Sequence, residues 1–168
     1  MIFYDYKKST REAIKMKKFI VLLAAVAILV PMVCYGTGTS VITSVTPYDN
    51  GVTHVLTTFV ADAADHTVPD LVISGYRGQY LCQIWTNPGA TQPTDNWDLY
   101  LKYDGGDILK AGGENRDEAN TEVAYPLTVG SALGGCVYVP GDLTLSVSGN
   151  SVNSATATIL LIIHRQGY

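Results

Sequence analysis

The side chains that most often carry out acid–base or nucleophilic chemistry are scattered along this chain. Its three histidines, His54, His66 and His164, lie in separate segments and lack the i, i+4 spacing of a helical metal-binding pair. His54 and His164 fall in strand-like runs, whereas His66 follows acidic residues, so that a metal ligand is the alternative there. No Gly-x-Ser-x-Gly motif marks a nucleophilic serine. The sequence therefore predicts a non-enzymatic protein with no catalytic residue, cofactor or metal site.

Four aspartates between residues 95 and 107 form an acidic cluster: Asp95, Asp98, Asp104 and Asp107. Ca²⁺ takes roughly six to eight oxygen ligands, often from a glycine-rich loop, and the Asp-Gly-Gly-Asp run at 104–107 has two carboxylates to offer. The spacing is not that of the twelve-residue calcium loop, and a hairpin turn explains the run without a metal. We expect a turn, with a calcium site as the alternative.

An apolar leader dominates the N-terminal part of the chain. Lys17 and Lys18 precede an unbroken apolar run over 19–30, and small residues at 34 and 36 fit the positions that signal peptidase reads. We predict a signal peptide over 16–36, forming a helix and cleaved after Gly36. We interpret residues 1–15 as an upstream extension that is not translated, since Met16 places the lysines next to the apolar run.

Two alternatives to cleavage remain open. A retained anchor needs about 20 apolar residues, and the run at 19–30 is shorter than that before Pro31 interrupts it. A lipidated Cys34 requires small residues just before it, whereas Pro31, Met32 and Val33 stand there. Contact with a membrane is therefore expected only through an uncleaved leader, and the predicted location is exported (periplasmic or extracellular).

Residues 37–168 are strongly acidic. They contain five basic and thirteen acidic residues, a net charge of −8, because six of the eleven cations lie before residue 37. Nucleic-acid binding needs a basic surface that displaces counterions from phosphates. The charge balance excludes that class and fits an exported protein whose expected partner is another protein or a second copy of itself.

Two cysteines, Cys82 and Cys136, remain after cleavage. In an oxidising compartment such a pair favours a disulfide over a metal or catalytic site. In the chain-entropy model the closed loop stabilises the fold by roughly 4 kcal/mol. The alternative is two separately buried thiols, because both cysteines lie in apolar, strand-like runs.

Short alternating runs separated by turn residues indicate an all-β domain over 37–168. The pair Asn50-Gly51 is a strong hairpin signal, and we find no amphipathic helix pattern after the leader. The pattern predicts a single β-sandwich or jelly-roll-like domain of eight to ten short strands. The expected strands are 40–46, 52–61, 71–74, 78–86, 97–103, 108–109, 122–129, 135–139, 143–148 and 156–164.

Two long polar loops, 87–96 and 111–120, flank a strand whose apolar face we expect to comprise Trp97, Leu99, Leu101 and Tyr103. Loops on a rigid sheet are where β-domains commonly place their contacts. The candidate interaction residues, all expected to be exposed near one end of the sandwich, are Asp95, Asn96, Glu114, Asn115, Arg116 and Asp117. For Arg116 the alternative is a bracing salt bridge with Asp117 or Glu114.

Aromatic residues suggest a second kind of role. Trp85, Trp97 and eleven tyrosines are numerous enough for stacking on sugars. The alternative is that they are core or cross-strand residues of a sheet that favours aromatic side chains.

Part of the chain resembles a known family. The run NPGATQPTDNWDLYLKYDGGDILKAGGENRDEANTE (87–122) is similar to small uncharacterised proteins encoded in tailed phages and prophages, and so is LTLSVSGNSVNSATATILLIIHR (143–165). The resemblance implies a single β-domain encoded beside virion genes, without catalytic residues to carry over. The function predicted is a non-enzymatic structural or interaction protein, which the resemblance implies to be phage- or prophage-derived and exported or virion-associated. The alternative is a secreted module that binds a glycan or cell-surface partner.

Overall fold

The computed structural model describes residues 37–126 and 135–165, which belong to one compact unit of the chain. The described residues form ten strands and no helix, so the all-β prediction is confirmed. In this part of the chain no helix is long and apolar enough to cross a membrane. The predicted signal helix and the extension over 1–15 lie outside the described residues.

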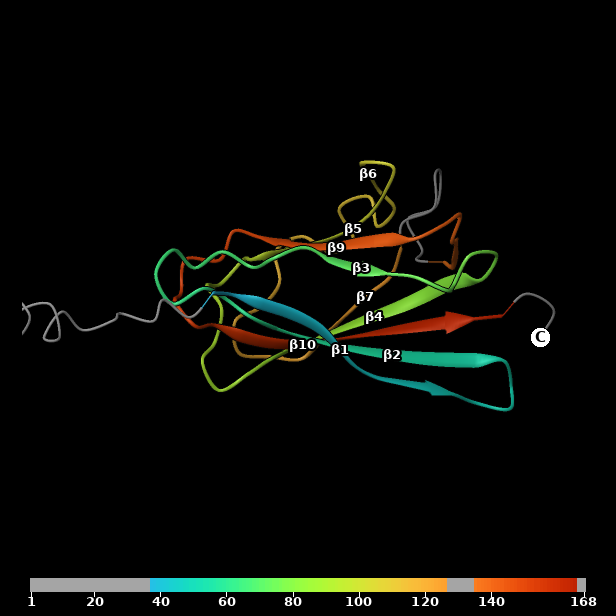
Figure 1. Ribbon diagram of the computed structural model, residues 1–168, viewed down its shortest axis with the longest axis horizontal. Coiled ribbons are helices and arrows are strands. Elements are labelled where there is room, and N and C mark those ends of the chain that lie inside the picture. The colour runs from blue at the N-terminus through green and yellow to red at the C-terminus, as the bar shows by residue number, and fades with distance from the viewer. Residues whose placement is uncertain (1–36, 127–134, 166–168) are drawn as a thin grey trace, which may run out of the picture. The chain divides into compact units, whose positions relative to one another are not determined.

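The ten strands form two antiparallel sheets, which Figure 1 shows as two layers. The larger sheet has the order β1-β2-β10-β4-β7, with β8 also paired to β4, and the smaller sheet has the order β3-β9-β5-β6. Their bounds are β1 (Thr39–Pro47), β2 (Val52–Val60), β3 (Leu71–Ile73), β4 (Tyr80–Pro88), β5 (Asp98–Tyr103), β6 (Gly106–Asp107), β7 (Glu122–Ala124), β8 (Val137–Tyr138), β9 (Leu143–Ser148) and β10 (Thr156–His164).

The strand pairs are nested along the chain. Strand β5 pairs with β6, β4 with β7, β3 with β9, and β2 with β10, all antiparallel. Successive pairs alternate between the two sheets, so the chain follows one long hairpin that is folded over itself. Strand β1 adds to the outer side of β2 and forms an edge of the larger sheet.

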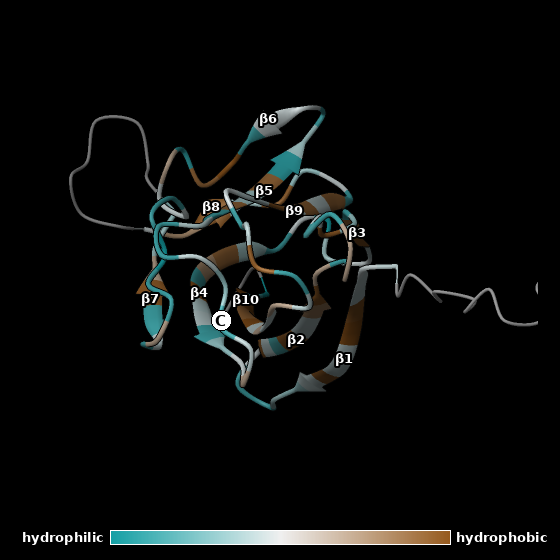
Figure 2. Ribbon diagram, turned by 90° about the vertical axis from the view of Figure 1, so that its left-hand side faces the viewer, coloured by the Kyte–Doolittle hydropathy of each residue, from teal (hydrophilic) through white to brown (hydrophobic). Residues whose placement is uncertain are grey.

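A single core lies between the sheets. Strand β10 alternates strictly, with Ala157, Ile159, Leu161 and Ile163 buried and the residues between them half-buried. Buried side chains of β2 and β4 join those of β5 and β9 in the same cluster, so both layers share one core, consistent with a sandwich. Figure 2 shows the matching distribution, with hydrophobic residues along the strands of both layers and polar residues on the loops and the end of β5.

The predicted strands lie within two residues of the observed bounds, except 108–109 and the end of 122–129. Residues 127–129 of the latter lie outside the described residues. Strands 143–148 and 156–164 are confirmed at both ends. Strand β4 continues to Pro88, because Asn87 still pairs with Thr158, and this shortens the predicted loop at 87–96. The short strand expected at 108–109 is wrong, since the pairing residues are Gly106 and Asp107. Tyr103, expected on the buried face with Trp97, Leu99 and Leu101, is exposed where β5 enters the turn.

Candidate interaction surface

The two long polar loops are joined to each other through Arg116. The amide of Asn96 donates to the carbonyl of Arg116 at 3.0 Å, and the amide of Arg116 donates to the carbonyl of Trp97 at 2.7 Å. The predicted residues therefore do come together, but their exposure is uneven. Asp95, Asn96 and Asn115 are exposed. The expectation of full exposure is wrong for Glu114, Arg116 and Asp117, which are half-buried because they close the loop onto the sheet.

The side chain of Arg116 braces the loop. Its Nε and Nη2 atoms donate to the carbonyl oxygen of Glu114 at 3.2 and 2.8 Å, and its Nη1 lies 3.5 Å from a carboxylate oxygen of Glu122. Only 13% of the side chain is exposed. The bracing alternative is thus supported, but with Glu122 and a main-chain carbonyl as partners in place of the expected carboxylates of Asp117 and Glu114.

Asp117 holds the next turn. Its carboxylate accepts from the amides of Ala119 and Asn120 at 2.6 and 2.7 Å and from the side-chain amide of Asn120 at 3.0 Å. These bonds, first among them the one from the Asn120 side chain, lower the pKa of Asp117 because they stabilise its ionised form. Its carbonyl oxygen accepts from the Trp97 indole at 3.3 Å. The loop is therefore held by its own polar groups.

Two carboxylates of the acidic cluster accept hydrogen bonds from backbone amides. The Asp107 carboxylate accepts from the amides of Leu101, Leu109 and Ala111 at 3.1, 3.1 and 3.3 Å. The amide of Asn115 donates to Asp98 at 3.0 Å. Among the described residues, no three His, Cys, Asp or Glu side chains are grouped closely enough to hold a metal ion. These two carboxylates are therefore accounted for as supports of turns and loops.

Cys82 and Cys136 lie at disulfide-bonding distance, in agreement with the predicted bridge. Leu81 pairs with Val137 where β4 meets β8, so the two cysteines occupy the next opposed position along the same ladder. The bridge fastens the segment that leads into β8 to a strand near the centre of the larger sheet. It is consistent with an oxidising compartment.

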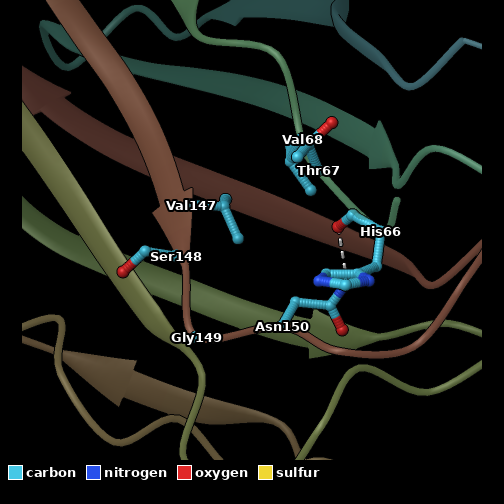
Figure 3. Close-up of a pocket in the computed structure, with 7 residues that line it drawn as sticks. All are labelled: His66, Thr67, Val68, Val147, Ser148, Gly149 and Asn150. Atoms are coloured by element: carbon cyan, nitrogen blue, oxygen red, sulfur yellow. Dashed lines mark hydrogen bonds between the residues drawn. The ribbon is translucent and has the colours of Figure 1, made fainter.

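A shallow pocket of about 280 Å³ lies where the loop after β2 meets the loop after β9 (Figure 3). Asn150 shapes it: its side-chain nitrogen donates to the carbonyls of His66 and Val152, and its oxygen accepts from the amides of Thr94 and Val152. His66 has a left-handed backbone, with φ of 57°, at the turn in this wall. The buried amide is thus committed to holding three loops together, which makes the pocket a structural joint.

The outer surface of the larger sheet has a different character. Strands β1, β2, β10 and β4, which lie side by side, contain no Asp, Glu, Lys or Arg. We call the side chains of these four strands that point away from the core the uncharged face. One row across it runs Ser44, Leu56, Leu160 and Trp85, and continues to Val123 of β7.

The two tryptophans have separate roles. Trp97 is fully buried and packs edge-to-face on Phe59, with 5.6 Å between ring centroids. Trp85 lies on the uncharged face with 38% of its surface exposed, and its indole nitrogen donates to the Gln83 side chain at 3.2 Å. The core alternative therefore holds for Trp97, and Trp85 alone of the two is available for contact. Sequence reasoning did not identify this face, because the lack of charge in each of the four strands forms one surface only through the order of the strands in the sheet.

Comparison with known proteins identifies no relative. No family model matches the chain, and no curated protein or solved structure matches it.

Proposed function

We propose that this protein is a non-enzymatic structural or interaction protein of phage or prophage origin, exported or virion-associated, which binds its partner through the uncharged face. The observation that carries the proposal is the separation of charge. Residues 37–168 have a net charge of −8, yet four neighbouring strands carry no Asp, Glu, Lys or Arg.

Covering a protein surface removes water from its side chains, which costs free energy where those side chains are polar or ionised. An acidic surface keeps molecules apart, and burying an ionised group is expensive unless it is paired. Protein interfaces accordingly lose charged residues from their centres and gain aromatic ones. The uncharged face has this composition, with Trp85 and Leu160 opposite each other among threonines. Covering this face is inexpensive in free energy, because no Asp, Glu, Lys or Arg side chain of these four strands has to be dehydrated.

We further infer that the domain is a jelly roll. The support is that its nested antiparallel pairs alternate between two sheets, which is the arrangement that a rolled-up hairpin produces. Jelly rolls form viral capsid proteins and also lectin domains. The architecture alone does not select a function, so it suits both the assembly proposal and its alternative.

Export rests on two independent features. The leader at 16–36 has the pattern of a signal peptide, and the Cys82–Cys136 pair suits an oxidising compartment. The resemblance of 87–122 and 143–165 to phage-encoded proteins supports the other proposed location, in which the protein is associated with a virion.

A matched pair of substitutions tests the assembly role. Val60 in β2 and Val72 in β3 are both exposed valines, and Val60 belongs to the uncharged face. We expect Val60→Lys to reduce co-purification with virions at least tenfold, because the lysine must be buried at the interface. Val72→Lys is the control, and both variants should keep the wild-type melting temperature. Equal co-purification of the two variants, or turnover of a substrate by the purified protein, contradicts the proposal.

The alternative is a secreted module for a neutral glycan. It is favoured by the exposed ring of Trp85 beside the amide side chains of Gln83 and Asn87, since sugars combine stacking on aromatic rings with hydrogen bonding. Binding of an immobilised neutral polysaccharide that Trp85→Ala abolishes supports this alternative. Wild-type protein that binds virions but no polysaccharide excludes it in favour of assembly.

A further inference from the structure

Strand β1 is an exposed edge of unusual length. It runs for nine residues, and Ser40 is its only residue that is not exposed. Its start is held in place, because the Ser40 hydroxyl donates to the carbonyl of Pro69 at 2.6 Å. Beyond that point Ile42 and Val45 are 39% and 49% exposed, although they lie opposite the buried Thr57 and Val55 of β2. The strand is therefore fixed at one end and uncovered on both faces.

The other edges of the sheets are short. Strands β3 and β7 have three residues each, and β6 and β8 have two. Proteins commonly protect an exposed edge by keeping it short or by placing charges on it, because unpaired amides and carbonyls otherwise recruit another strand. Strand β1 is neither short nor charged, and its only such features are a bulge between Ile42 and Ser44 and the proline at its end, Pro47. Within residues 37–126 and 135–165, no strand pairs with its outer edge.

We propose that a second copy of this chain adds its own β1, antiparallel, to the outer edge of β1 and joins the two larger sheets into one continuous sheet. The register of β1 selects this occupant. An antiparallel second copy can place side chains that point to the same face opposite each other, and neither strand carries an Asp, Glu, Lys or Arg that would have to be buried. The nearest acids lie beyond the two ends of β1: Asp49 follows its last residue, and Asp62 lies beside Gly38 at its start.

The side chains of β1 are compatible with a two-fold axis. Ile42 and Val45 point to the core side, and Val41 and Ser44 point outward, because the bulge at residue 43 shifts the alternation by one residue. A two-fold axis that passes between Ile42 and residue 43 places Val41 of one copy opposite Ser44 of the other. Both of these side chains point away from the core. The same axis places Val45 opposite Ser40 on the core side. Pairing then stops at Pro47, which has no amide hydrogen to donate.

The role of the joined sheet rests on the proposed function, because the dimer doubles the uncharged face through which we propose that the protein binds its partner. Strands β4, β10, β2 and β1 of one copy continue into the same four strands of the other. The interaction surface becomes eight strands wide, with no Asp, Glu, Lys or Arg in any of them.

Sedimentation of the exported protein over a range of concentrations tests the association. We expect a reversible dimer, and we expect Val45→Lys to raise its dissociation constant at least tenfold, because an exposed lysine on an edge opposes strand pairing. Val45 lies on the core side of β1 and does not belong to the uncharged face. Val72→Lys on the smaller sheet is the control. A wild-type protein that remains monomeric throughout overturns the inference, and so does a dimer that Val45→Lys leaves unchanged.

A cysteine cross-link tests the geometry. Ile42→Cys places two thiols near the axis on the same side of the joined sheet, and mild oxidation should link two copies covalently. Val72→Cys, on the three-residue edge strand β3, should not link. Equal linking of the two variants overturns the β1 pairing, as does linking of Ile42→Cys to a different protein, which identifies a foreign strand as the occupant.

The two proposals fail in distinguishable ways. If the protein is monomeric and Ile42→Cys stays unlinked while Val60→Lys still reduces virion co-purification, the inference about β1 is wrong and the proposed function stands. If Ile42→Cys links two copies while neither virions nor other partners are bound, the dimer stands and the proposed function is wrong.

Discussion

Trp97 and Arg116 form an isolated antiparallel bridge, in which the Arg116 amide donates to the Trp97 carbonyl at 2.7 Å. One partner is fully buried in the core and the other lies in a polar loop. The bridge ties the loop at 111–120 to the sandwich, and the Arg116 side chain then holds that loop through Glu114 and Glu122. The loop is consequently part of the folded unit.

Removing the Arg116 side chain should therefore lower stability. We expect Arg116→Ala to cost about 1–2 kcal/mol, since hydrogen bonds from a charged group contribute more than neutral ones, whereas a partly exposed ion pair adds little. Thermal unfolding measures the change. Arg77→Ala, at an exposed arginine, is the control. Unchanged melting combined with lost virion association would make Arg116 a contact residue and not a brace.

The Cys82–Cys136 bridge should contribute strongly to stability. The two residues are separated by 54 positions, and the chain-entropy model assigns a loop of that size about 4 kcal/mol. We expect the double variant Cys82→Ser, Cys136→Ser to melt at a lower temperature, and the wild type to melt like the variant in the presence of a reductant. Non-reducing peptide mapping should find the two peptides linked. Native protein whose two thiols alkylate readily contradicts the bridge.

Asp107 should matter more for stability than an ordinary surface aspartate. Three backbone amides donate to its carboxylate, and Asp107→Ala leaves them without that partner. We expect a cost of about 2 kcal/mol in denaturant unfolding. Asp70→Ala, at an exposed position, is the control and should change the free energy of unfolding little. If added Ca²⁺ raises the melting temperature of the wild type but not of Asp107→Ala, the calcium alternative is correct.

Acid should destabilise the fold through Asp65 and Asp117. Hydrogen bonds from Thr67 and from Asn120 lower the pKa of these carboxyls below the usual range of aspartate. The unfolded chain therefore takes up protons first, so the stabilisation is present above the usual pKa of aspartate and is lost as the pH falls through the folded-state values. We expect Asp117→Asn to make the decline of melting temperature in acid shallower. Parallel declines in variant and wild type would show that Asp117 does not contribute.

The leader gives a prediction about the mature chain. We expect N-terminal sequencing of the exported protein to begin at Thr37, because small residues stand at 34 and 36. Full-length protein that remains in the membrane fraction supports the anchor, and a lipid on Cys34, detected by mass spectrometry, supports the lipoprotein.

Much of the fold could be predicted from the sequence because period-two alternation is local. The run at 143–148 alternates leucine or valine with hydroxyl residues, and its strand is confirmed at both ends. Which strands pair is not local information. Thr158 lies opposite Thr58, one hundred residues earlier, and no residue in either strand specifies the other.

The candidate site was harder to predict, since loop residues were judged by polarity. Arg116 and Asp117 are polar, but their side chains form hydrogen bonds with their own loop, which composition does not reveal. The uncharged face was missed for the opposite reason. Each of its strands looks ordinary alone, and the absence of charge becomes a surface only when β1, β2, β10 and β4 are placed side by side.

The position of β10 has a consequence for biosynthesis. It is the last strand of the described residues, yet it lies between β2 and β4 near the middle of the larger sheet, so that sheet stays open until residue 164 has been synthesised. Until then β2 and β4 are not joined and the core lacks Ile159, Leu161 and Ile163, so the domain completes its folding only after its last strand has emerged.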